Sequence, residues 1–276
     1  MSAQLLDGKA LAEEIKLEVK RRIAEVGTPT LAVVLVGDDP ASAVYVSSKK
    51  KACEFTGIRS LSFELQADTS EDELLNLVDE LNSRDDVDGI LVQLPLPKHI
   101  QEDKVLLRIK PEKDVDAFHP YNVGMLSIGR PIFKPCTPAG VIELIKKSGV
   151  LISGNNCVVV GRSNIVGKPV SMLLLAENGT VTTCHSRTAN LAEVCAQADI
   201  LVAALGKPKF ITANMIKEGA VVIDVGIHRM ENKKLCGDVD FDACKEKASF
   251  ITPVPGGVGP MTIALLMKNC LEAHIG

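Results

Sequence analysis

Tyr45 and Lys49 lie four positions apart in a stretch predicted to form one helix, so their side chains leave the same helix face about one turn apart. An aromatic ring beside an ammonium group suits a flat heterocycle, which can stack on the ring while a proton donor or acceptor lies at its edge. The chain has no Trp and only two Tyr, so few positions could supply such a ring. On spacing alone, the alternative is a solvated lysine run beside a half-buried tyrosine.

Two further polar side chains are candidates in the first half of the chain. Gln93 lies near the end of an apolar run, Gly89–Leu94, and the carboxyl ends of parallel strands form the ligand-binding edge of open α/β sheets. A buried Gln needs hydrogen-bond partners, and Lys49 is a candidate. Asp116 follows in Asp114-Val115-Asp116, where a carboxylate could pair with an amino-pyrimidine edge. The alternative at Asp116 is an ordinary surface turn.

The segment 158–170, VVVGRSNIVGKPV, is a β-branched run that ends in a glycine turn and opens a helix. Gly161 lets the backbone turn, and Gly167 lets the first helical turn approach a phosphate, whose charge is favoured at a helix N-terminus. The spacing G-x-S-x-x-x-G-x-P differs from the common fingerprint G-x-G-x-x-G. The pattern indicates a nucleotide-binding turn, and a plain strand-to-helix connection is the alternative.

The next predicted strand indicates which dinucleotide binds. In NAD-binding folds an acidic residue about 20 positions beyond the turn contacts the ribose hydroxyls, whereas a cation accommodates the 2′-phosphate of NADP. Here the strand ends in Thr182-Thr183-Cys184-His185-Ser186-Arg187, without an acid. We therefore expect NADP, with Arg162 and Ser186 as phosphate ligands and Arg187 as a further candidate.

Strands and helices alternate through the first half of the chain. Apolar residues recur at helical spacing over 9–26, while Asp39-Pro40 and Gly57 bound a helix from Pro40 to about Thr56. Ser70-x-x-Glu73 is a capping box that opens another helix. The predicted strands are Leu31–Val36, Ile58–Leu65 and Gly89–Leu94. This alternation predicts right-handed βαβ units and a parallel sheet covered on both faces.

The second half continues the alternation after a proline-rich hinge around 131–138. The predicted strands are 157–161, 180–185, 200–205 and 220–225, and the predicted helices are 138–147, 167–178 and 189–198. A last apolar helix, Met261–His274, has no place in the second sheet and is expected to return to the first domain. The predicted fold class is α/β with two three-layer domains, 1–136 plus 261–276 and 137–260. The second is a Rossmann-like, doubly wound nucleotide-binding domain, and we expect an active-site cleft between the two.

Composition narrows the class of partner and the compartment. At 276 residues the chain is long enough for two ordinary domains. A net charge of −4 without a basic cluster argues against nucleic acid, and no apolar run reaches the ~18 residues of a membrane span. The charged N-terminus lacks a signal-peptide pattern. Eight scattered cysteines without a C-x-x-C pair indicate reduced core residues, so we expect a cytoplasmic protein without a bound metal.

Six motifs, in order, resemble the bifunctional methylenetetrahydrofolate dehydrogenase/methenyltetrahydrofolate cyclohydrolase family, and together they span nearly the whole chain. They are Tyr45-x-x-x-Lys49, Val92-Gln93-Leu94-Pro95-Leu96-Pro97, Lys113-Asp114-Val115-Asp116, Pro135-Cys136-Thr137-Pro138, Gly161-Arg162-Ser163 through Gly167-x-Pro169, and Pro255-Gly256-Gly257-Val258-Gly259-Pro260-Met261-Thr262. One departure is Ala117, because the family usually has Gly after the aspartate. The absence of an extra synthetase domain resembles the short, bacterial-type members.

The resemblance implies a role for each candidate residue. Lys49 is the catalytic lysine, Tyr45 stacks on the folate, Gln93 orients Lys49, and Asp116 holds the pterin ring. The glycine-rich loop, with Gly257, Gly259 and Pro260, lies beside the substrate and the nicotinamide. The positions that match the family's cofactor contacts are Gly161, Arg162, Ser163, Ser186 and Ile227, to which the turn adds Gly167.

The implied function is that of a one-carbon folate enzyme with two activities. Hydride leaves the one-carbon bridge of 5,10-methylenetetrahydrofolate for the nicotinamide of NADP, and the methenyl cation then takes up water and opens to 10-formyltetrahydrofolate. The second step needs proton transfer, which a partly desolvated lysine can supply. The resemblance also implies a homodimer formed through the second domain.

Other functions remain open from sequence alone. A Tyr-x-x-x-Lys pair also belongs to short-chain dehydrogenases, where it lies downstream of the dinucleotide turn, whereas here it lies far upstream. A dehydrogenase for another substrate is a second alternative. A third is a non-catalytic dinucleotide sensor, which would bind the cofactor and turn nothing over. The joint presence of Tyr45, Lys49, Gln93 and Asp116 argues against the sensor.

Overall fold

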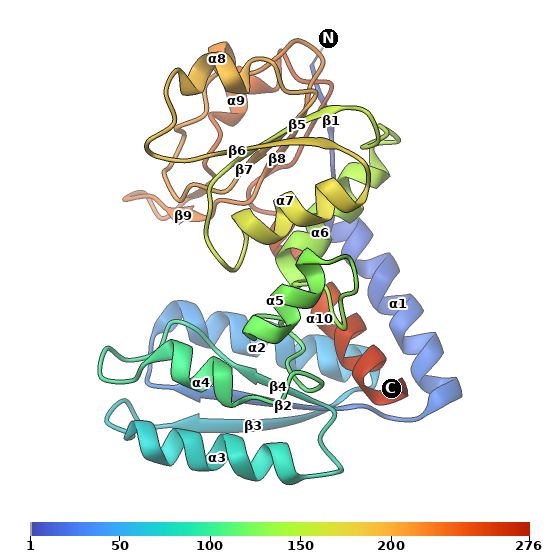
Figure 1. The fold of residues 1–276 in the computed structure, drawn as a ribbon, viewed down its shortest axis with the longest axis vertical. Helices are drawn as coiled ribbons and strands as arrows, with labels where there is room; N and C mark the ends of the chain where they lie inside the picture. The colour runs from blue at the N-terminus through green and yellow to red at the C-terminus, as the bar shows by residue number, and fades with distance from the viewer. Residues whose placement is uncertain (1) are drawn as a thin grey trace. The chain divides into compact units, whose positions relative to one another are not determined.

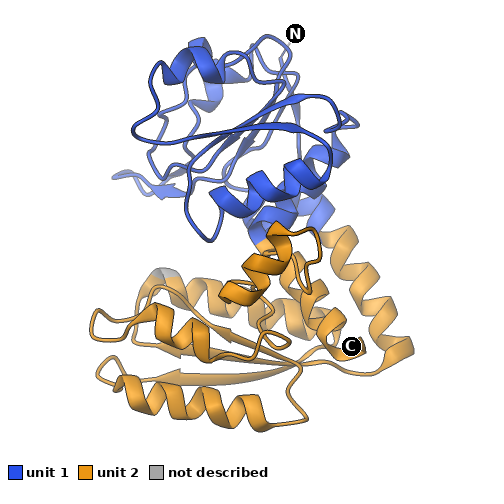
Figure 2. Cartoon of the chain, viewed as in Figure 1, with its two compact units in different colours: residues 1–12, 137–262 blue, residues 13–136, 263–276 orange. Residues whose placement is uncertain are grey.

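The computed structural model describes residues 2–276, which form two compact units (Figure 2). Unit 1 contains the N-terminal stretch up to Ala12 and Thr137–Thr262. Unit 2 contains Glu13–Cys136 and Ile263–Gly276. Helix α1 (Gly8–Val26) and helix α10 (Val258–Ile275) each contribute residues to both units.

Unit 2 is built on a three-stranded parallel sheet in the order β3-β2-β4 (Figure 1). The strands are β2 (Thr30–Val36), β3 (Arg59–Leu65) and β4 (Gly89–Val92), and the helices between and after them are α2 (Pro40–Thr56), α3 (Glu71–Ser83), α4 (Glu102–Arg108) and α5 (Pro120–Ser127). Every residue of the central strand β2 is buried. Its alternate residues Ala32, Val34 and Val36 share an apolar core with α3 and α4, which therefore cover one face of the sheet.

The ends of two helices follow the predicted stereochemistry. Helix α2 begins after Asp39, whose carboxylate accepts the Ser42 N–H at 2.7 Å, and ends at Gly57 in the left-handed conformation, φ 90°. Helix α3 begins with the full capping box between Ser70 and Glu73. These local devices confirm the predicted helix starts.

Unit 1 contains a six-stranded, entirely parallel sheet in the order β1-β11-β8-β7-β5-β6. Its strands are β1 (Gln4–Leu5), β5 (Asn156–Val160), β6 (Thr180–Cys184), β7 (Ile200–Ala203), β8 (Val221–Asp224) and β11 (Phe250–Ile251). Its helices are α6 (Cys136–Lys147), α7 (Gly167–Ala176), the short α8 (Leu191–Cys195) and α9 (Phe241–Cys244), and the 3₁₀ turn η1 (Ala213–Met215). The chain passes from β5 to β6 on one side and then to β7 on the other, so the strand order reverses at β5. This is the doubly wound arrangement that the sequence predicts.

The N-terminal stretch differs from the prediction, which placed it in the first domain. Strand β1 pairs in parallel with β11, and the N–H groups of Gln4 and Leu6 donate to the carbonyls of Ser249 and Ile251, both at 2.9 Å. These bonds carry the N-terminal stretch into unit 1.

Some elements are shorter than predicted, and others carry no clear sequence pattern. Strand β4 ends at Val92 instead of Leu94. Pro95, just beyond the predicted end, has no N–H to donate to a neighbouring strand, so the ladder cannot continue. The sequence did not predict the hairpin of β9 (His228–Arg229) and β10 (Leu235–Cys236), which forms a separate two-stranded sheet. Among residues 2–276 no helix is both long and apolar enough to cross a bilayer. No cluster of metal-ligating side chains occurs among the same residues.

Candidate functional site

Lys49 is buried in unit 2 and held by Gln93. Its side chain is 6 % exposed, and Nζ donates to Gln93 Oε1 at 3.0 Å. The Gln93 amide is itself oriented, because Nε2 donates to the Leu94 carbonyl at 2.6 Å and so leaves the oxygen facing the lysine. The next two lysines, Lys50 and Lys51, are exposed. The solvated-run alternative therefore does not describe Lys49, and the hydrogen bond expected from the sequence is formed.

Tyr45 lies one helical turn before Lys49 on α2. The residue is 37 % exposed, so part of it is open to a ligand. Partial burial raises the pKa of the phenol above its usual value, which keeps the ring neutral. A neutral, partly open aromatic ring meets the requirement for stacking on a flat ligand.

Asp116 lies in a loop that its neighbour Asp114 fixes in place. Asp114 is 2 % exposed and accepts the His119 N–H and the Asn122 Nδ2–H, each at 2.8 Å. Burial raises the pKa of the Asp114 carboxyl, which these hydrogen bonds partly offset. Asp114 is thus a structural residue, and the neighbouring Asp116 is half-buried. Ala117, which follows it, adopts a left-handed φ of 58°.

The Cys136 thiol is a shared neighbour of Asp116 and Lys49. Burial raises the pKa of this thiol well above its usual value, the Asp116 carboxylate raises it further, and the Lys49 ammonium lowers it. Because the Coulomb interaction falls with distance, both charges must lie close to the thiol to change its pKa. The loop residue Asp116 and the helix residue Lys49 therefore converge around the start of α6.

Asn269 on α10 was not predicted and holds the same region together. Its Nδ2 donates to the Val115 carbonyl at 2.8 Å and to the Lys134 carbonyl at 2.9 Å. Asn269 is 7 % exposed, so both bonds are sheltered from water. They tie the segment before Asp116 to the segment before Cys136. The only sequence signal was an amide in an otherwise apolar helix.

In unit 1, the turn after β5 is closed by glycines. Gly161 has a φ of 136°, and a Cβ there would collide with the Ala204 carbonyl. A Cβ on Gly167 would collide with the Gly161 carbonyl. Ser163 Oγ accepts the N–H groups of Val166 at 3.2 Å and Gly167 at 3.3 Å. The turn therefore needs both glycines, for close approach of backbone to backbone.

The two predicted phosphate ligands lie at one edge of this sheet. Strands β5 and β6 run in parallel with Val160 opposite Cys184, so Arg162 and Ser186 both follow the carboxyl ends of neighbouring strands. Both side chains are exposed, as is Arg187. An arginine and a hydroxyl beside a helix N-terminus form an arrangement that suits a phosphate.

The glycine-rich loop and Ile227 also belong to unit 1. Ile227 is 44 % exposed beyond the end of β8, and its Cδ1 is the nearest side-chain atom to the Cβ position of Gly259, at 3.4 Å. The backbone of Gly257 packs against Gly8, and a Cβ on Gly8 would collide with the Gly257 carbonyl. Pro260 is half-buried in the first turn of α10. The predicted substrate-binding residues are therefore divided between the units. Gly257, Gly259 and Pro260 belong to unit 1, whereas Tyr45, Lys49, Gln93 and Asp116 belong to unit 2.

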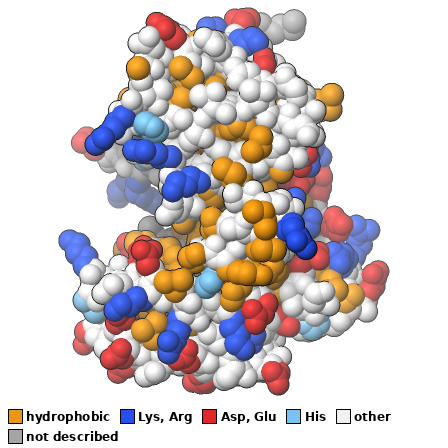
Figure 3. Space-filling model, viewed as in Figure 1, with side chains coloured by type: hydrophobic (Ala, Val, Ile, Leu, Met, Phe, Trp, Pro, Cys, Tyr) orange, Lys and Arg blue, Asp and Glu red, His pale blue; other side chains and the backbone are white. Residues whose placement is uncertain are grey.

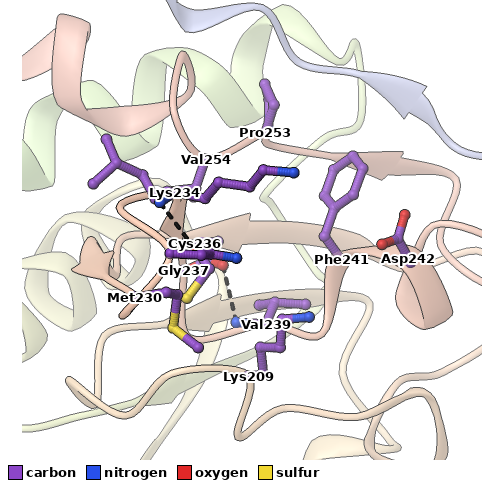
Figure 4. A pocket seen from close by; sticks show the side chains of 13 residues that line it. Lys209, Met230, Lys234, Cys236, Gly237, Val239, Phe241, Asp242, Pro253 and Val254 are labelled. Atoms are coloured by element: carbon purple, nitrogen blue, oxygen red, sulfur yellow. Dashed lines mark hydrogen bonds between the residues drawn. The ribbon is translucent and has the colours of Figure 1, made fainter.

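A pocket in unit 1 is lined by a different set of residues (Figure 4). Its cavity of about 430 Å³ lies between the β9–β10 hairpin, α9 and the Pro253-Val254 segment. Lys209, Lys234 and Phe241 are among the side chains that line it. None of the predicted site residues does so.

Family models match both halves of the chain. The catalytic domain of tetrahydrofolate dehydrogenase/cyclohydrolase matches residues 6–116, and the NAD(P)-binding domain of the same family matches residues 135–275.

Individual relatives match over almost their full length. The chain is 62 % identical over 273 residues to the bifunctional protein FolD of Lachnoclostridium phytofermentans, covering 98 % of this chain and 97 % of that protein. Its structure is similar to that of the bifunctional FolD methylenetetrahydrofolate dehydrogenase/cyclohydrolase of Campylobacter jejuni, with a TM-score of 0.96, 48 % identity and 99 % of each chain covered. The Trypanosoma brucei dehydrogenase-cyclohydrolase, solved with NADP and an inhibitor, gives a TM-score of 0.95 at 40 % identity, covering 100 % of this chain and 98 % of that one.

Proposed function

The chain belongs to the tetrahydrofolate dehydrogenase/cyclohydrolase family, and from this we propose that it oxidises 5,10-methylenetetrahydrofolate to the methenyl compound with NADP. It then hydrolyses the methenyl compound to 10-formyltetrahydrofolate. The observation that carries this proposal is the buried Lys49 ammonium, held by Gln93, in the part of the chain that matches the family's catalytic domain.

In the proposed mechanism, unit 2 binds the folate. The Tyr45 ring stacks on the flat part of the substrate, and the Asp116 carboxylate accepts hydrogen bonds from the amino-pyrimidine edge of the pterin. The substrate's one-carbon bridge then lies near Lys49, which the Gln93 oxygen holds in one orientation.

Lys49 serves the hydrolytic step. Water adds to the methenyl carbon and loses one proton. The hydroxyl so formed loses its second proton as the carbonyl forms, and the ring nitrogen that leaves this carbon gains one, so the net reaction releases one proton to solvent. In its neutral form the Lys49 amine, shielded from bulk water, can take up the first proton, and the ammonium so formed can give one to the leaving nitrogen. Water is thus consumed, one C–N bond breaks, and the formyl group remains on the other nitrogen.

We assign the NADP site to unit 1. The fit rests on the turn, in which a side chain at Gly161 or Gly167 would collide with neighbouring backbone, and on the exposed Arg162 and Ser186 at the same sheet edge, which suit a phosphate. Ser163 shapes this turn, Arg162 and Ser186 would hold the 2′-phosphate, and Ile227 would contact the nicotinamide. When bound, NADP accepts the hydride from the one-carbon bridge. We also assign substrate contacts to the loop residues Gly257, Gly259 and Pro260, of which the two glycines carry no side chain.

A turnover assay tests the function. Purified protein with methylenetetrahydrofolate and NADP should produce NADPH, and with methenyltetrahydrofolate alone it should hydrolyse the methenyl compound. A protein that binds NADP but catalyses neither reaction is a sensor, and the proposal then fails. The same protein with NAD at equal low concentration provides the cofactor control.

We also propose a cytoplasmic homodimer formed through unit 1, on the strength of the family resemblance. Sedimentation equilibrium of the purified protein should give twice the mass of the 29.5 kDa chain. A single species at the chain mass across micromolar concentrations would contradict it.

A further inference from the structure

Asp238 is a fully buried carboxylate that receives four hydrogen bonds. Its side chain is 0 % exposed. Oδ2 accepts the N–H groups of Leu205 at 2.8 Å and Gly206 at 3.0 Å, while Oδ1 accepts the Lys207 N–H at 2.8 Å and lies 2.7 Å from His228 Nε2. Three consecutive backbone N–H groups thus converge on one buried carboxylate and supply most of its hydrogen bonds.

A second buried carboxylate, Asp224, holds Asp238 in place. Asp224 accepts the N–H groups of Gly226, Asp238 and Val239, each at 2.9 Å. Figure 4 shows the bond that reaches Val239, and both partners line the pocket. A Cβ on Gly226 would collide with the Asp238 carboxyl group. The pair is therefore closely packed and leaves no room for alternative positions.

The segments fixed by this pair follow neighbouring strands of the nucleotide-binding sheet. Leu205 to Lys207 come after β7, and Gly226 to His228 come after β8, which pairs with β7 in parallel. Ile227 lies between two residues that the pair binds directly, Gly226 to Asp224 and His228 to Asp238. The carbonyl of Ala204, at the start of the first segment, is the group that Gly161 approaches. The first segment thus borders the turn assigned to NADP, and the second follows the next strand along the same edge of the sheet.

We infer that Asp238 is a positioning residue of the NADP site: it fixes the segment 205–207 and, through His228, the orientation of Ile227. This inference rests on the proposed function. Asp238 reaches the cofactor only through these segments, so its loss should weaken binding of NADP and leave hydrolysis of the methenyl compound in place, since Lys49, Gln93 and Asp116 lie in the other unit.

Asp238→Asn tests the inference, because it keeps the size of the side chain but turns an amide N–H toward backbone N–H groups. We expect the Kd for NADP, measured by calorimetry, and the KM for NADP to rise about tenfold or more. The reason is that the substitution leaves buried N–H donors of the cofactor site without an acceptor. The KM for methylenetetrahydrofolate and the rate of methenyl hydrolysis should stay within about twofold of the parent. The matched control is Asp240→Asn, since Asp240 is only paired loosely with Lys209, at 3.9 Å.

A second variant keeps the test decisive if Asp238→Asn does not fold. His228→Ala removes one of the four hydrogen bonds at a side chain that is 21 % exposed, and it should raise the Kd for NADP severalfold. If folded Asp238→Asn binds NADP as the parent does, or if it loses both activities equally, the inference is wrong. If Asp238→Asn does not fold, parental affinity in His228→Ala overturns it. If the parent protein itself does not bind NADP, the proposed function fails instead.

Discussion

The Lys49 ammonium and the Gln93 side-chain oxygen are joined by a 3.0 Å hydrogen bond across two elements, the helix α2 and the end of strand β4. The bond gives a buried cation one defined acceptor. It leaves the other ammonium protons free for a ligand.

Replacing Lys49 with Met should abolish methenyl hydrolysis. Methionine retains much of the apolar stem but has no amine, so the proton carrier is lost while the packing remains. General acid–base contributions run to roughly 10²–10⁴-fold, which is the expected loss in kcat. The methenyl compound should accumulate in the coupled assay if hydride transfer survives. The exposed Lys50→Met is the control, and equal losses in the two variants would refute the assignment of Lys49.

Replacing Gln93 with Leu should slow hydrolysis less than the loss of Lys49 does. The amine stays present, but its acceptor is replaced by a methyl group, and a buried donor without an acceptor costs about 1–3 kcal/mol. We expect a drop of about tenfold in the hydrolysis rate, with an unchanged Kd for NADP. A hydrolysis rate equal to that of the parent would show that Gln93 does not orient the lysine.

Replacing Arg162 with Ala should weaken NADP binding and leave NAD binding unchanged. The exposed guanidinium follows β5 and lies at the same sheet edge as Ser186, where a 2′-phosphate would supply its partner. The measurement is the Kd for each dinucleotide at several salt concentrations. If Arg162→Ala binds NADP normally while Arg187→Ala does not, the phosphate ligand is Arg187 instead.

Replacing Ala117 with Gly should raise the free energy of unfolding by about 0.5–1 kcal/mol. The left-handed φ of 58° costs an L-residue about 1–2 kcal/mol, which exceeds the chain entropy that glycine adds. The same change at Ala139, a buried position within α6, should lower stability by about 1 kcal/mol. Urea unfolding compares the two, and equal losses would contradict a strained Ala117.

Asp224 should titrate far above an ordinary aspartate. Burial raises the pKa of its carboxyl from 3.8 to about 6, although three N–H groups oppose the shift. The folded state thus binds this proton more tightly than the unfolded chain, so ionisation of Asp224 lowers the free energy of unfolding as the pH rises from about 4 to 6. The change amounts to roughly 3 kcal/mol.

Carbon-13 NMR of labelled aspartates measures this midpoint directly. Asp242 serves as the reference, because its hydrogen bond from Lys245 lowers the pKa of its carboxyl. An Asp224 midpoint at or below 4 would mean that the hydrogen bonds outweigh burial. In Asp238→Asn the midpoint should fall, since the neighbouring Asp238 charge contributes to the raised pKa.

Features governed by local stereochemistry could be predicted from the sequence. The helix from Pro40 to Thr56 is bounded by a cap, a proline and a glycine, and each acts within one turn of its own position. The turn between Gly161 and Gly167 is equally local. The contact between Lys49 and Gln93 could also be expected, because a buried amide at a strand end needs a partner.

Features that depend on distant backbone could not be predicted. Strand β1 has two residues, too few to show a period, and its partner β11 lies near the other end of the chain. The roles of Asp224 and Asp238 carry no sequence signal, because their partners are mainly backbone N–H groups, which any sequence supplies. Asn269 is a similar case, since it donates to two carbonyls.

The bonds made by Asn269 have a consequence for how the protein is synthesised. Unit 2 is interrupted by Thr137–Thr262, so the segment that carries Asp116 is translated long before the helix that holds it. The sheet of unit 1 likewise lacks β11, the partner of its first strand, until Ile251 leaves the ribosome. Neither unit can complete its hydrogen bonds during translation of the first two thirds of the chain. A ribosome stalled before Asn269 should therefore hold a nascent chain in which the segment before Asp116 remains open to proteases.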